Sequence, residues 1–167
     1  VFAAPGDYGA LQLIGTAAAF SIQLYCDFSG YSDMAVGAAR VMGFRLMENF
    51  RTPFFSRSIA EFWRRWHISL SSWFRDYLYI PLGGSRRGTA RKWLNILIVF
   101  AVSGLWHGAA LTFIVWGLLN GLYQVVGGIT APLRGRVRHA LGLRDDGRVT
   151  CLLQIAVTFA LFSLSMV

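Results

Sequence analysis

His107 lies inside the longest uncharged stretch of the chain, where an ionisable side chain is most costly. No Asp, Glu, Lys or Arg occurs in the 41 residues between Lys92 and Arg134. A helix starting at Lys92 would carry His107 about 22 Å along, deep in a hydrocarbon core of about 30 Å. An imidazole at that depth predicts a functional site, and it suits proton transfer near neutral pH. The alternative is a histidine hydrogen-bonded to a neighbouring helix for packing alone.

A second histidine, His67, belongs to the segment 58–80, SIAEFWRRWHISLSSWFRDYLYI. Helical periodicity places it on an aromatic face, with Glu61 and Arg65 on the opposite, charged face. Ser58 and Glu61 have capping-box spacing. The segment is too charged to cross lipid, so it predicts an amphipathic helix that lies at the interface or enters the protein. From these residues alone, a packed histidine with one hydrogen bond is the simpler interpretation of His67.

Two carboxylates follow the first apolar stretch. Asp27 and Asp33 lie six residues apart, with serine and glycine between them. We expect a first helix over 8–26 to break here and to restart, with Ser32 or Asp33 as its cap, before ending at Gly43. Irregular backbone at membrane depth must be packed in protein or line a wet cavity. The two acids therefore either line a cavity or cap a helix end at the interface.

The basic residues are almost all arginine, 15 of 16. Arginine favours fixed contacts with phosphates and carboxylates. The turn 81–88, PLGGSRRG, combines glycines with Arg86 and Arg87 and has the composition of an anion-binding nest. It is neither a Walker loop nor a GxGxxG loop, and a short basic turn at the membrane surface explains it equally well.

The composition predicts an integral membrane protein of the all-α class. Hydrophobic residues make up 55% of the chain and charged residues 14%. Each apolar run is long enough for at least one crossing. The predicted spans are 8–26, 93–107, 109–130 and 149–167, and in the third Asn120 needs a partner within the bundle.

The net charge of +8 is concentrated between the spans. The basic residues lie in the segments 40–92 and 134–148, which predicts that both segments are cytoplasmic loops. Binding of a nucleic acid is therefore the weaker interpretation of the positive charge. Cys26 and Cys151 are not part of a CxxC motif and predict buried thiols, so no metal site is expected. Because the chain starts without Met and stops inside an apolar run, we expect one partial membrane domain that further helices complete.

Three motifs then resemble those of the membrane-bound O-acyltransferase family, in its bacterial branch that acetylates alginate. They are YCDFSGYSDMAVG, EFWRRWHISLSSWFRDYLYIPLGGS and GLWHGAALTFIVWGLLNG, and the resemblance covers about residues 24–125. It implies a helical core pierced by a tunnel, with an acyl donor entering from the cytoplasm and an acceptor from the other side. His107 matches the family's invariant histidine, and His67 matches its second histidine.

The resemblance implies acyl transfer to a hydroxyl from a thioester, acetyl-CoA first, in the bacterial inner membrane. His107 would act as the base, and His67 would orient the acceptor or stabilise the oxyanion. Other residues expected to bind the donor or order the tunnel wall are Arg64, Arg65, Arg86, Arg87, Asp27, Asp33 and Asn120.

The acceptor implied by the resemblance is a polysaccharide, alginate first, reached through a periplasmic partner that accepts acetyl groups. Peptidoglycan acylation and teichoic-acid D-alanylation fit the same residues. Two interpretations from other classes stay open: a transporter or export subunit, since broken helices and intramembrane charges occur there too, and a structural membrane subunit.

Overall fold

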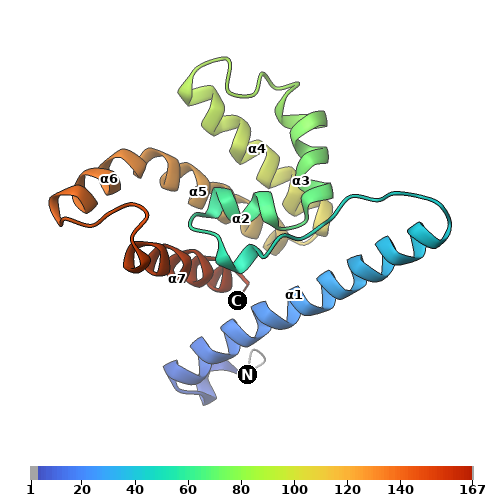
Figure 1. Ribbon diagram of the computed structural model, residues 1–167, viewed down its shortest axis with the longest axis horizontal. Helices are drawn as coiled ribbons and strands as arrows, with labels where there is room; N and C mark the ends of the chain where they lie inside the picture. Colours follow the sequence, from blue (N-terminus) through green and yellow to red (C-terminus); the bar gives the residue numbers. More distant parts are fainter. Residues whose placement is uncertain (1–3, 167) are drawn as a thin grey trace.

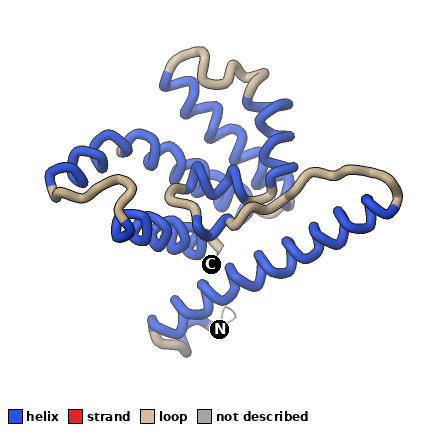
Figure 2. Tube along the Cα trace, in the orientation of Figure 1, coloured by secondary structure: helices blue, strands red, loops and turns tan. Residues whose placement is uncertain are grey.

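The computed structural model describes residues 4–166, and within them it contains helices and loops but no strand (Figures 1 and 2). This confirms the all-α class. The seven α-helices are α1 (Ala10–Val41), α2 (Ile59–Arg65), α3 (Ile68–Phe74), α4 (Thr89–His107), α5 (Leu111–Ile129), α6 (Ala131–Ala140) and α7 (Arg148–Ser165). Three single turns accompany them: η1 (Pro5–Asp7), η2 (Pro53–Phe55) and a π-helical turn, η3 (Arg75–Tyr79).

Helix α1 is continuous, so the predicted break at Asp27–Asp33 is wrong. No proline occurs in the helix, and both aspartates are exposed, so their side chains leave the backbone ladder intact. Ser32 is not a cap; its Oγ accepts a hydrogen bond from Asn49 Nδ2 at 3.1 Å. The predicted end is confirmed, since Gly43 follows the helix with φ +85° and completes a C-terminal cap.

Helices α4 and α5 form a tight antiparallel hairpin, which confirms that the long uncharged run contains two helices (Figure 1). Glycines bring the two backbones into contact. A Cβ on Gly117 would overlap the carbonyl oxygen of Phe100, and one on Gly104 would overlap that of Phe113. The hairpin fixes where α4 ends and therefore where His107 lies.

We expect Gly117→Ala to lower the free energy of unfolding by about 1–3 kcal/mol, because the added methyl meets backbone that must move. The matched control is Gly127→Ala on the same helix, where nothing lies within 4 Å of the new Cβ. Thermal unfolding of the purified protein in detergent measures both variants. Equal melting temperatures would contradict the close-packed hairpin.

Two described helices, α5 and α7, are long and apolar enough to cross a membrane. The predicted crossings, by α1, α4, α5 and α7, all remain predictions. Val167, the end of the predicted last span, lies outside the described residues. Part of the predicted loop 134–148 is helical, because α6 continues from Thr130 directly after α5.

An aromatic core joins α2 to α7 and to the segment that precedes α2. Phe62 and Trp66 stack on one another and both contact Phe162 of α7, at ring-centroid distances of 4.3 Å for Phe62 and 5.3 Å for Trp66. Phe50 packs edge-on against Trp66 at 5.0 Å. A buried hydrogen bond between Ser21 Oγ and Ser163 Oγ, 2.9 Å long, ties α1 to α7. This core holds the residues just before His67 in place.

Candidate active site

The amphipathic segment predicted over 58–80 is helical, but it is not one helix. It breaks at Trp66 and His67, and the last turn before Ile80 is π-helical. Trp66 is extended, with ψ 129°, and His67 has a left-handed backbone, with φ 46° and ψ 55°. A residue other than glycine seldom adopts that conformation, so the surrounding contacts must maintain it, and such residues cluster at functional sites.

The N-terminal half of the segment follows the sequence prediction. Ser58 Oγ accepts a hydrogen bond from Glu61 N at 3.2 Å. In a capping box the Glu61 side chain would accept from the backbone N–H of Ser58, but here it accepts from that of Arg57, one residue earlier. Glu61 also forms an ion pair with Arg65 at 2.6 Å.

Asn49 stabilises the break from outside the helix. Its carbonyl accepts from Ile68 N at 2.9 Å, and its side-chain Oδ1 accepts from Ser69 N at 3.2 Å and from Ser69 Oγ at 3.0 Å. Its Nδ2 donates to Ser32 of α1. These bonds satisfy the free N–H groups at the start of α3 and link the His67 turn to α1.

We expect Asn49→Ala to lower the free energy of unfolding by about 1–3 kcal/mol, because it leaves the Ser69 N–H at the start of α3 without its acceptor. Asn49→Asp keeps the acceptors for Ser69 and should retain most of the stability. Thermal unfolding of the purified protein in detergent measures both variants. A melting temperature of Asn49→Ala equal to that of the wild type would show that this residue does not stabilise the His67 turn.

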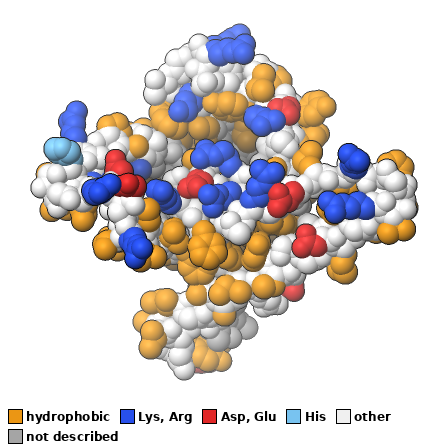
Figure 3. All heavy atoms as spheres, in the orientation of Figure 1, with side chains coloured by type: hydrophobic (Ala, Val, Ile, Leu, Met, Phe, Trp, Pro, Cys, Tyr) orange, Lys and Arg blue, Asp and Glu red, His pale blue; other side chains and the backbone are white. Residues whose placement is uncertain are grey.

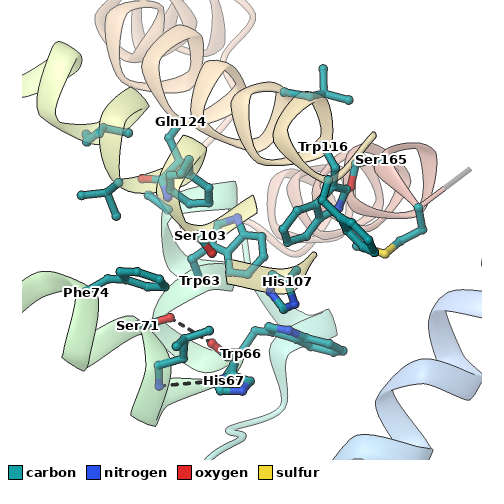
Figure 4. Close-up of a pocket in the computed structure, with 18 of the residues that line it drawn as sticks. Trp63, Trp66, His67, Ser71, Phe74, Ser103, His107, Trp116, Gln124 and Ser165 are labelled. Carbon is teal, nitrogen blue, oxygen red and sulfur yellow. Dashed lines mark hydrogen bonds between the residues drawn. The ribbon is translucent and has the colours of Figure 1, made fainter. Parts of the chain in front are cut away.

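His67 and His107 line one cavity of about 1240 Å³, although 40 residues separate them in the sequence. The cavity lies between α2, α3, α4 and α5, and side chains of α1 and of the end of α7 also line it. Figure 4 shows the His107 ring between Trp116 and the Trp66–His67 turn. Ile96 and His107 also line it, so it follows α4 for about 16 Å.

Aromatic rings orient His107. Trp106 and Trp116 meet its ring edge-on, at centroid distances of 5.0 and 5.2 Å. Trp106 also faces His67 at 6.4 Å, so it lies beside both histidines. Within residues 4–166 neither ring nitrogen of His107 makes a hydrogen bond, which leaves both available to a substrate.

His67 is hydrogen-bonded through one nitrogen only. Its Nδ1 accepts from the backbone N–H of Leu70 at 3.3 Å, which caps α3. Burial lowers the pKa of His67 below its ordinary value of 6.5, so the ring is neutral at pH 7. A neutral ring whose Nδ1 accepts must carry its proton on Nε2. His67 is therefore a hydrogen-bond donor in this cavity.

Of the four predicted arginines, only Arg64 lines the cavity. It is exposed and has no carboxylate partner among the described residues. Arg65 is instead paired with Glu61. Arg86 and Arg87 are exposed on the glycine turn, which Asn95 ties to α4 through bonds to the carbonyls of Leu82 and Gly84.

The three other predicted residues do not line the cavity. Asp27 and Asp33 lie exposed on α1. Asn120 is fully buried on α5, where its Nδ2 donates to the carbonyl of Trp116 at 2.9 Å. Asn120 therefore contacts the backbone of Trp116, one of the tryptophans beside His107. Its burial agrees with the prediction that it faces the bundle.

The cavity residues that were not singled out from the sequence include Ser103, Gln124 and Trp116. Ser103 precedes His107 by one helical turn, so the i,i+4 spacing was an available signal. Asn49 carried no comparable signal, because its role depends on contacts with residues 17 and 20 positions away. Among the described residues, no three His, Cys, Asp or Glu side chains are grouped in a way that would hold a metal ion.

Comparison with known proteins assigns this arrangement to a class. Residues 7–167 match the membrane-bound O-acyltransferase (MBOAT) family, and the chain belongs to that family. It is 50% identical over 145 residues to the probable alginate O-acetylase AlgI of Pseudomonas fluorescens, 87% of this chain and 27% of that protein.

Two further relatives have names that refer to other polymers of the cell envelope. The peptidoglycan O-acetyltransferase of Helicobacter pylori is 50% identical over 67% of this chain and 21% of its own length. The teichoic acid D-alanyltransferase of Bacillus subtilis is 40% identical over 84% and 36%. The chain thus spans about a quarter of the length of the alginate O-acetylases that it matches.

Proposed function

We propose that this chain forms the reaction chamber of an O-acyltransferase that moves an acetyl group from a cytoplasmic thioester, acetyl-CoA, to a hydroxyl. The observation that carries the proposal is the single cavity lined by His67 and His107. One histidine is a donor through Nε2 and the other has both nitrogens free, which are complementary roles for acyl transfer.

In the proposed reaction, the acceptor hydroxyl oxygen attacks the thioester carbonyl carbon while His107 takes the hydroxyl proton. Negative charge develops on the carbonyl oxygen, and the Nε2–H of His67 donates to it. The carbon–sulfur bond then breaks, the ester is released, and the thiolate receives the proton from His107. His107 ends neutral, so no further reagent is required.

The length of the cavity supports a donor with an anionic head and a long arm. Along α4 the lining extends from Ile96 to His107, and Arg64 of α2 also lines the cavity. A guanidinium without a carboxylate partner suits a phosphate. We propose that Arg64 contacts the donor phosphates while the thioester reaches His107.

The acceptor we propose is a polysaccharide, reached through a periplasmic partner, in the bacterial inner membrane. The names of the alginate O-acetylases support alginate as the first choice. The relative that acts on peptidoglycan supports a second candidate, and the teichoic acid D-alanyltransferases support D-alanyl transfer from a carrier-protein thioester.

The test uses membranes that contain the protein with its full coding sequence and acetyl-CoA labelled in the acetyl group. We expect release or transfer of label that depends on the protein. Turnover with a D-alanyl carrier-protein thioester instead would favour the second donor. A protein that moves polysaccharide across the membrane but turns over neither thioester would support the transporter interpretation.

A further inference from the structure

A second cavity, of about 930 Å³, lies at the opposite end of α4 from His107. The start of α4, the end of α5 and the start of α7 meet there, with α6 and α2 at its sides. Ala60, Arg64, Ile96 and Gln124 line both cavities, so the two are neighbours. The proposed reaction uses only the first cavity and Arg64.

The second cavity is lined by five basic side chains and no acidic one. They are Arg57, Arg64, Lys92, Arg134 and Arg138. Of these five, only Arg138 has a carboxylate partner among the described residues, Asp145 at 2.7 Å. The Lys92 ammonium lies 4.3 Å from the centre of the Trp93 ring. Four cations without a counter-charge in one cavity create a strongly positive potential, which an anion would relieve.

Much of the rest of the wall is apolar and exposed. It includes Leu133 and Val137 of α6 and Leu153 and Val157 of α7, all between 49% and 61% exposed. Helix α7 is one of the two described helices able to cross a membrane. A soluble anion would leave these side chains uncovered, whereas an acyl chain beside the helix would cover them.

Figure 3 shows many Lys and Arg side chains across the middle of one face of the molecule, with a few Asp and Glu side chains among them and hydrophobic side chains beside them. Basic pockets between membrane helices are the expected sites for anionic lipid head groups. We propose that the second cavity binds an anionic phospholipid, with its phosphate on Arg57, Lys92 and Arg134 and an acyl chain along α6 and α7. This site is independent of the proposed acyl transfer, since its ligand is not consumed.

The test is native mass spectrometry of the intact protein in detergent, after incubation with phosphatidylglycerol. We expect retention of bound lipid, and about 25-fold weaker binding for the double variant R57Q/K92Q, since each basic residue near anionic lipid contributes about fivefold. The charge-conserving R57K/K92R should retain the lipid. The matched control is R136Q, which removes a charge from α6 at a residue that does not line the cavity.

Two further binding measurements distinguish a lipid phosphate from the phosphates of a soluble ligand. Zwitterionic phosphatidylethanolamine should bind much more weakly than phosphatidylglycerol, and coenzyme A should not displace the bound lipid. The proposal is overturned if the wild type retains no lipid, if R57Q/K92Q retains as much as R136Q, or if coenzyme A competes. Because the readout is bound lipid, loss of acyl transfer alone leaves the result unchanged.

Discussion

Acyl transfer from a labelled thioester should fall about 10³-fold when His107 is replaced by Ala, with the protein level in the membrane unchanged. Loss of a general base has an effect of that order. The ring has no hydrogen bond within the described residues, so its removal leaves no polar partner unsatisfied. The fold should therefore survive, and the loss should appear in kcat, because the proton moves only as the transition state forms.

His139→Ala is the matched control, since this exposed histidine lies on α6 and lines neither cavity. Its transfer rate should equal that of the wild type. His107→Gln retains polar groups near the position of the ring but cannot act as a base, so it should be as inactive as the alanine variant. Transfer by His107→Ala within threefold of the wild type would remove this residue from the chemistry.

The sequence predicted the hairpin and its histidine because both depend on patterns that lie close together in the chain. The uncharged run between Lys92 and Arg134 contains two helices, and His107 ends the first. Charge and periodicity are local properties, so α4, α5 and α7 were foreseeable. The continuous α1 was not, because serines, a glycine and acids resemble a break, although both acids are exposed and Ser32 is buried against Asn49.

The His67 turn could not be predicted for a different reason. Periodicity across 58–80 continues through Trp66, and nothing local demands a left-handed residue. The break depends on Asn49, which supplies acceptors from a loop, and on an aromatic core that includes Phe162 from the other end of the chain. Contacts between distant segments decide this geometry, and a single sequence does not display them.

Replacing His67 should separate two roles that one ring combines. Its Nδ1 caps α3, and its Nε2–H is the proposed donor to the oxyanion. Asn tolerates the left-handed backbone, accepts from Leu70 through Oδ1 and keeps a donor in Nδ2, so His67→Asn should stay within about tenfold of the wild-type rate. His67→Asp keeps the acceptor but has no donor, so it should fold normally and lose about 10²–10³-fold in transfer.

His67→Ala removes both roles and should also lower the free energy of unfolding by about 1 kcal/mol through loss of the cap. Turnover and thermal unfolding together distinguish the three variants. Wild-type turnover in His67→Asp would show that the donor role is wrong. A melting temperature of His67→Ala equal to that of the wild type would show that His67 does not cap α3.

The burial of His67 predicts a pH dependence of stability. Because burial lowers the pKa of His67, the unfolded chain binds more protons than the folded one between the folded pKa and 6.5. The contribution of this residue to stability is therefore complete above pH 6.5 and is lost as the pH falls through that window, since protonation removes the Nδ1 acceptor. Thermal unfolding measured downward from pH 7 should show this loss in the wild type and a smaller one in His67→Asn. Parallel curves for the two proteins would mean that Nδ1 does not hold the start of α3, and the assignment of Nε2–H as the donor would lose its basis.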